Sequence, residues 1–158
     1  MKRLLAAFLI VLALPVVPAA GQYRIVSEDD AGVTVEFTAA RPDTRGTSLR
    51  IPGYIQERIP GRPVLPVRRF LFEVPADRGI RLQVTGSRTE LLSGFVPEVW
   101  SGGAGEAEPA GEGAPFASLV SVETMRKRRV ALVDVRPVIR DAEGGLLWAG
   151  AITVRLSW

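Results

Sequence analysis

The sequence of 158 residues contains no histidine and no cysteine. This absence excludes serine–histidine and cysteine–histidine nucleophile pairs, thiolate redox centres, and zinc sites built from cysteine and histidine. Lysine is scarce too: beyond Lys2 the chain has only Lys127, and no serine stands three residues before it to form a serine–lysine dyad. We therefore expect a protein that is not an enzyme, with no catalytic residue, no cofactor and no bound metal.

An excess of one charge is also missing, because 20 basic residues face 17 acidic ones and two of the basic residues, Lys2 and Arg3, lie in the N-terminal segment. The only basic run is Arg126–Arg129. Four basic residues that lead into a strand are more typical of a solvated turn or sheet edge than of a polyanion site. We expect no nucleic-acid partner.

The first 21 residues have the pattern of a signal peptide: a basic start at Met1–Arg3, an apolar stretch over Leu4–Val17, and small residues up to Gly21. The apolar stretch is shorter than the roughly 20 residues that a membrane span needs. We expect a signal-peptide helix over 1–21, cleavage near Gly21, and a periplasmic or extracellular domain over 22–158. Contact with a membrane is expected only through the uncleaved signal peptide.

Apolar and polar residues alternate over Val33–Ala39, which predicts a strand with one buried face. The turn-forming residues 27–32 precede it, so Tyr23–Val26 and Val33–Phe37 are expected to form a hairpin. Pro63–Pro75 is a longer extended segment, in which Pro66 indicates an edge strand or a strand start. Together with a strand at 80–85, it is a candidate for a second hairpin.

The C-terminal part shows the clearest strand pattern. Val130–Val138 reads as a strand, Asp141–Gly145 as a turn, and Leu146–Trp158 as a strand whose alternate residues share one apolar face. Short strands, frequent glycine and proline turns, and the lack of a helical period predict an all-β fold. We expect an antiparallel, jelly-roll-like β-sandwich of roughly seven to nine strands.

Ser101–Pro115 has no large apolar side chain and is expected to be a flexible loop. Its glutamates, among them Glu106 and Glu108, would repel phosphate, so the glycines there do not indicate a phosphate loop. Other carboxylates, at 28–30 and at 141 and 143, lack calcium-loop spacing and are expected in turns. Trp148 and Trp158 are expected in the core, which leaves Trp100 as a plausible contact residue.

Two stretches carry a family resemblance. Gly61-Arg-Pro-Val-Leu-Pro66, followed by an apolar strand that ends at Pro75, is the first. The second joins Arg128-Arg129, Val133–Val138, a glycine turn and Ile152–Leu156. Together they resemble the N-terminal propeptide of gingipain-type cysteine peptidases, over about residues 52–158.

The resemblance implies a β-sandwich that follows a signal peptide, assists folding of the peptidase and covers its active site until cleaved. The implied partner is a cysteine peptidase catalytic domain, either in cis in a longer precursor or in trans. This sequence ends at Trp158 before any such domain, so a truncated precursor and a domain acting in trans both stay open. The alternative is a stand-alone secreted β-sandwich that serves as a binding or adhesion module.

In the arginine-specific members of the family, a loop inserts a basic side chain into the specificity pocket of the peptidase, but residues 101–115 contain no lysine or arginine. The nearest basic substitutes are Arg126 and Lys127. The edge strand around Leu65–Phe72 offers backbone groups for pairing. The candidate contacts with a peptidase are Arg126, Lys127, Trp100, Glu106 and Glu108.

Overall fold

The computed structural model describes residues 23–102 and 113–158, so the expected signal peptide and most of the expected loop, including Glu106 and Glu108, lie outside the described residues. Eleven strands occupy the described part. In chain order they are β1 (Tyr23–Asp29), β2 (Gly32–Thr38), β3 (Asp43–Arg45), β4 (Ser48–Arg50), β5 (Ile55–Glu57), β6 (Leu65–Glu73), β7 (Arg81–Leu91), β8 (Ala117–Met125), β9 (Arg128–Val135), β10 (Val138–Arg140) and β11 (Leu146–Ser157).

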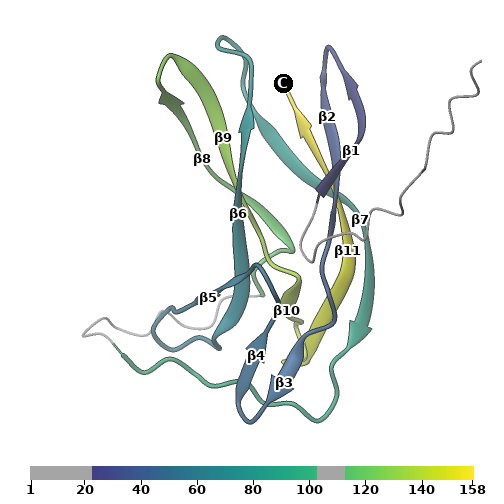
Figure 1. The fold of residues 1–158 in the computed structure, drawn as a ribbon, viewed down its shortest axis with the longest axis vertical. Helices are drawn as coiled ribbons and strands as arrows, with labels where there is room; N and C mark the ends of the chain where they lie inside the picture. The colour runs from purple at the N-terminus through teal and green to yellow at the C-terminus, as the bar shows by residue number, and fades with distance from the viewer. Residues whose placement is uncertain (1–22, 103–112) are drawn as a thin grey trace, which may run out of the picture.

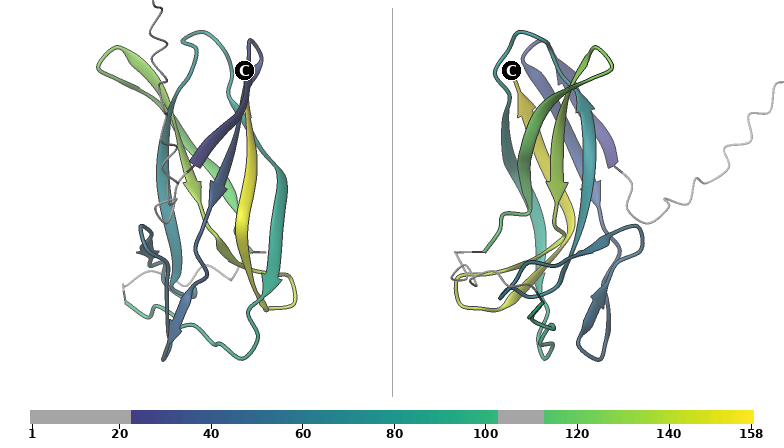
Figure 2. Two further views of the ribbon diagram at one scale, coloured as in Figure 1. Left: turned by 45° about the vertical axis from the view of Figure 1, so that its right-hand side comes forward. Right: turned by 90° about the vertical axis from the view of Figure 1, so that its left-hand side faces the viewer.

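The strands form two principal sheets that face each other, and β3 and β4 form a separate small hairpin (Figures 1 and 2). One sheet has the order β1-β2-β11-β10, with β7 also paired to β11, and the other has the order β5-β6-β9-β8. Every pairing between these strands is antiparallel. The fold is therefore the expected antiparallel β-sandwich.

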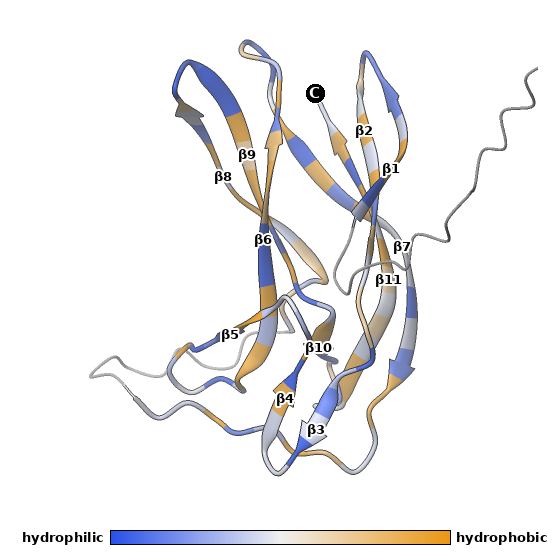
Figure 3. Cartoon of the chain, in the orientation of Figure 1, coloured by the Kyte–Doolittle hydropathy of each residue, from blue (hydrophilic) through white to orange (hydrophobic). Residues whose placement is uncertain are grey.

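The main core lies between the two sheets and is built from the alternating apolar residues that the sequence pattern indicates, which appear as orange bands along the strands in Figure 3. Phe37 of β2 packs against Phe70 of β6 with ring centroids 4.7 Å apart. Val133 and Val135 of β9 are fully buried. Each such side chain contributes about 1.5–3 kcal/mol by leaving water, so this interface holds the two sheets together.

The N-terminal hairpin is confirmed, because β1 pairs with β2 from Tyr23 opposite Phe37 to Asp29 opposite Gly32. The turn is shorter than expected, since it contains only residues 30 and 31. Gly32 is required at its end: its φ is +152°, and a Cβ there would collide with the carbonyl oxygen of Leu156.

The second expected hairpin is wrong. Strand β6 pairs with β9 in one sheet and β7 pairs with β11 in the other, so the segment between them crosses the sandwich. Phe72 of β6 and Leu82 and Val84 of β7 pack against the same core from opposite sheets. A turn signal between two amphipathic strands cannot by itself distinguish a hairpin from such a crossover.

The C-terminal strand begins at Leu146 as expected and ends at Ser157, one residue early, and its apolar residues do not share a single face. A β-bulge between Ala149 and Ala151 interrupts the pairing of β11 with β7 and resets the alternation. Ile152 and the apolar residues after it belong to the main core, whereas Leu146 and Trp148 pack in a second cluster. The other members of that cluster include Ala39, Leu49, Ile51 and Val138.

The number of strands exceeds the expected seven to nine because β3, β4, β5 and β10 contain three residues each. Pro66 lies at the start of β6, as expected, and Arg68–Glu73 pair only with β9 among the described strands. That half of β6 is therefore an edge strand. In the described residues no helix is long and apolar enough to cross a membrane.

Candidate functional site

Arg126 and Lys127 form the two-residue turn of the β8–β9 hairpin, since Met125 and Arg128 are the last paired residues on either side. Both have positive φ angles, 48° and 69°, as in a type I′ turn. Non-glycine residues in this region cost of order 1–3 kcal/mol each. The side chains are exposed, and neither forms an ion pair with another described residue. The turn thus presents two positive charges with no acidic partner in the described part of the chain.

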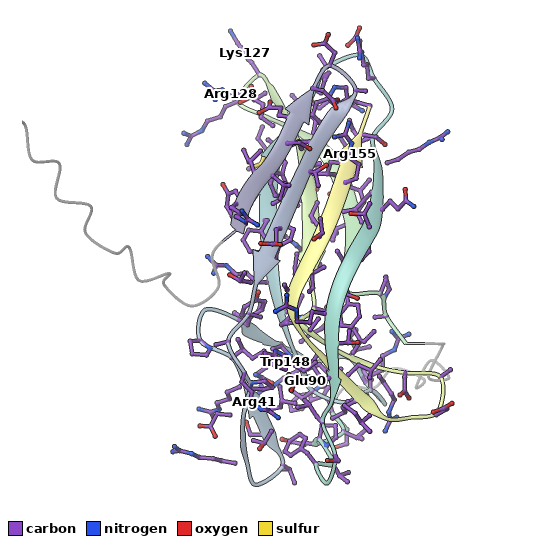
Figure 4. The ribbon with its side chains drawn as sticks, turned by 90° about the vertical axis from the view of Figure 1, so that its right-hand side faces the viewer. Arg41, Glu90, Lys127, Arg128, Trp148 and Arg155 are labelled. Carbon is purple, nitrogen blue, oxygen red and sulfur yellow. The ribbon has the colours of Figure 1, made fainter. Side chains whose placement is uncertain are left out.

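The other two members of the basic run have structural partners. Arg128 forms an exposed ion pair of 3.0 Å with Glu73. Arg129 donates hydrogen bonds of 2.7 Å to the carbonyl of Pro75 and of 2.5 Å to that of Arg78. Figure 4 shows Lys127 and Arg128 at one end of the sandwich, far from Trp148 at the other.

Trp100 lies at the opposite end of the sandwich from this turn. Its backbone accepts a hydrogen bond of 2.9 Å from Gly61 and donates one of 3.0 Å to Arg62. The guanidinium of Arg58 covers its ring at 4.8 Å from the centroid, a cation–π contact. Trp100 is half-buried and therefore has a structural role in holding the segment next to β6.

The three candidate contact residues that the structure describes, Arg126, Lys127 and Trp100, are not brought together. Pro63 bridges to Val99 beside Trp100, whereas Val74 donates a hydrogen bond to Arg129 near the hairpin turn. At about 3.3 Å per residue, the extended chain between these two points covers roughly 36 Å. A peptidase contact through the turn and one through Trp100 would use different ends of the domain.

Among the carboxylates expected in turns, Glu28 and Asp29 instead end strand β1, and two of the set, Asp29 and Asp141, bind backbone amides of the adjacent turns. Asp29 accepts a hydrogen bond from the Ala31 N–H, and Asp141 accepts bonds of 3.0 and 2.6 Å from the amides of Glu143 and Gly145. Hydrogen bonds from Arg155, above all, hold the pKa of Asp29 below its ordinary value. Within residues 23–102 and 113–158, no three metal-binding side chains gather into a site.

Sequence reasoning missed a cleft of about 350 Å³ at the Trp100 end of the domain. Residues of the segment from Glu57 to Leu65 line one side of it, and the segment from Arg136 to Gly144 lines the other. The chain at Gly113 forms part of the wall, and its backbone lies so close to the carbonyl of Arg140 that a side chain would not fit there. Its lining residues are separated by up to 87 positions in the sequence, so no local motif could have revealed it.

A network of charged groups borders this cleft and joins four strands. Arg136 donates hydrogen bonds of 2.9 and 2.7 Å to the two carboxylate oxygens of Glu57, and one of 2.8 Å to Ser118. The buried carboxylate of Asp134 accepts bonds of 2.7 and 2.9 Å from Arg69 and lies 3.6 Å from Arg136. The hydrogen bond with Glu57 is the main cause that raises the pKa of Arg136, so its charge is permanent.

Comparison with solved structures finds the same architecture in two proteins of Porphyromonas gingivalis. One structure is the complex of RgpB pro- and mature domains, with a TM-score of 0.69 and 17% identity over 86% of this chain and 82% of that chain. The other, of gingipain K, concerns its zymogenic latency, with a TM-score of 0.59 and 19% identity over 92% of this chain and 94% of that one. The fold is that of a gingipain pro-domain.

This likeness confirms the expected resemblance at the level of fold. The gingipain chains are matched over at least 82% of their length, so the likeness covers a whole pro-domain rather than a shared hairpin or sheet. No protein-family model matches the sequence, and no curated protein sequence matches it. At 17–19% identity, the likeness to these chains is one of fold.

Proposed function

We propose that this chain is a non-catalytic, propeptide-like domain that binds a gingipain-type cysteine peptidase, inhibits it and assists its folding. The single observation that carries the proposal is the gingipain pro-domain fold, matched over 86% and 92% of the chain. One of those pro-domains is in a complex with its mature domain, and the other belongs to a study of zymogen latency. The partner is a peptidase catalytic domain, in cis or in trans, and the site of action is periplasmic or extracellular.

The turn at Arg126 and Lys127 is the contact we favour. It projects two cationic side chains that have no partner among the described residues. Arginine and lysine at positive φ angles cost stability, so their presence in this turn is better explained by a binding role than by stability. A gingipain-type peptidase that accepts basic side chains would offer them a complementary acidic pocket. Trp100 and the edge of β6 are secondary candidates, and Glu106 and Glu108 remain sequence-based candidates.

The test is inhibition of a purified gingipain-type peptidase by the purified domain. In the key variant, Arg126→Asn with Lys127→Gly, both charges are removed while asparagine and glycine suit the positive φ angles, so the hairpin is kept or stabilised. The matched control replaces Arg45 and Arg50 of the β3–β4 hairpin with glutamine. We expect saturable inhibition by the wild type and the control, and an inhibition constant at least about tenfold higher for the turn variant.

The inhibition assay tests the propeptide role and the Arg126–Lys127 contact separately. Inhibition that is unchanged in the turn variant would keep the propeptide role but exclude the Arg126–Lys127 contact. A folded domain that neither inhibits nor binds any gingipain-type peptidase would contradict the proposal. That result would favour the alternative, a stand-alone secreted binding or adhesion module.

A further inference from the structure

The cleft between the segment 57–65 and the segment 136–144 has an unusual charge arrangement. Three arginines, Arg62, Arg136 and Arg140, line it together with two acids, Glu57 and Asp141. Glu57 and Arg136 neutralise each other through two short hydrogen bonds. The Oδ1 atom of Asp141 is occupied by the turn amides of Glu143 and Gly145. No ion pair joins the Arg140 side chain to an acid among the described residues, although the Asp141 carboxylate lines the same cleft.

Arg140 also carries an unused hydrogen-bond donor. Its Nε atom is buried and has no hydrogen-bond partner in the described part of the chain. Because the protein's own atoms cover Nε, a ligand in the cleft would meet the outer Nη groups of this guanidinium. A carboxylate is the group that a guanidinium binds best, because two oxygens match its parallel N–H groups.

The rest of the cleft selects for an apolar group attached to that carboxylate. Ile59, Pro63, Leu65 and Ile139 are the partly exposed apolar residues of its wall. A volume of about 350 Å³ lies in the range of small-molecule pockets and is large enough for the last residues of a peptide or for a medium-length alkyl chain. Ligand sites of this kind combine an apolar lining with a few polar groups that fix orientation.

We propose that this cleft binds a carboxylate borne on an apolar stem, with Arg140 as the residue that receives the carboxylate. The proposal does not depend on the propeptide role, because the cleft lies at the end of the domain opposite the Arg126–Lys127 turn. A peptide C-terminus, an acidic side chain and an alkyl carboxylate share this chemistry.

The experiment measures binding of defined probes to the full domain by calorimetry and by amide chemical shifts. The probes are octanoate and octylamine, and three acetylated apolar tripeptides: one with a free C-terminus, one amidated, and one amidated with glutamate as its last residue. We expect octanoate to bind and octylamine not to bind. Binding by the free-acid peptide alone assigns a C-terminal carboxylate, and binding by the glutamate peptide assigns an acidic side chain.

Two variants connect the binding to the cleft. Arg140→Gln removes the charge and should weaken octanoate binding at least about tenfold, with the loss partly restored in Arg140→Lys. Ala142→Phe keeps all three arginines but adds bulk at an exposed position on the cleft wall, and it should also weaken binding. Arg128→Gln, at the opposite end of the sandwich, is the distant control. Equal binding of octanoate and octylamine, no binding of any probe, or octanoate binding unchanged in both cleft variants would overturn the proposal.

Discussion

Replacing Glu57 with glutamine should destabilise the domain far more than a change in an exposed glutamate. The side chain of Arg136 is only 12% exposed, and Glu57 supplies two of its hydrogen bonds, at 2.9 and 2.7 Å. Removing one partner of a buried ion pair costs about 3–5 kcal/mol. Here the cost is reduced, because glutamine keeps one acceptor oxygen, Ser118 keeps its bond, and Asp134 stays 3.6 Å away.

We therefore expect Glu57→Gln to lower the free energy of unfolding by about 2–3 kcal/mol. For a domain of this size, roughly 3–5 °C of Tm accompanies each kcal/mol, so the Tm should fall by about 6–15 °C. Urea unfolding followed by tryptophan fluorescence and thermal unfolding followed by circular dichroism both measure this change.

The matched control is Glu90→Gln, which breaks the 3.1 Å pair between Arg41 and Glu90, whose side chains are 67% and 53% exposed. An exposed pair of this kind contributes at most about 1 kcal/mol. A loss in Glu57→Gln no larger than that in Glu90→Gln would refute the reasoning that burial of Arg136 makes its partner indispensable. A double-mutant cycle with Arg136→Met isolates the coupling between the two side chains.

Three further changes test other parts of the fold. Phe37→Ala should cost about 3–5 kcal/mol in urea unfolding, because the residue is 2% exposed and its ring packs against those of Tyr23, Phe70 and Phe72; a loss near 1 kcal/mol would contradict its core role. Burial raises the pKa of Tyr54 above 10.0, so stability should be full below pH 10.0 and fall as the pH rises through the higher folded pKa, a fall that Tyr54→Phe abolishes in alkaline unfolding curves. The lowered pKa of Asp29 stabilises the fold above pH 3.8, and this contribution is lost as the pH falls through the folded value; acid unfolding of Asp29→Asn should converge with that of the wild type there.

Alternating apolar residues and turn residues in the sequence predicted the strands and the hairpin that depend only on neighbouring residues. Alternation over Val33–Ala39 and Leu146–Trp158, with turn residues beside each, was sufficient to place β2 and β11 and the β1–β2 hairpin. The same reasoning paired β6 with the strand after it, because it had no information on which sheet each strand joins. The bulge at Ala149–Ala151 also escaped it, since the residues on either side remain apolar and keep the appearance of one continuous pattern.

The candidate site depended on contacts between distant segments. The sequence singled out Arg126 and Lys127 as a basic pair at a turn, and the structure places them at the tip of a hairpin. It gave no sign that Arg136 binds Glu57, 79 positions away, or that Arg140 lines a cleft with Arg62. Arg136 lies between β9 and β10, and Arg140 ends β10. Nothing in the sequence around either arginine indicates that the segment 57–65 folds against it.

The separation of the two ends has a mechanistic consequence. A peptidase that contacts only the Arg126–Lys127 turn leaves the cleft, at the other end of the sandwich, free to bind its carboxylate. A peptidase that lies along the sandwich covers both ends and competes with that ligand. Linkage requires that, if the ligand lowers the affinity of the domain for the peptidase by some factor, the peptidase lowers its affinity for the ligand by the same factor. Octanoate affinity measured with and without bound peptidase therefore distinguishes end-on from lateral binding: equal affinities require an end-on contact, and mutual weakening requires that the peptidase reaches or distorts the cleft.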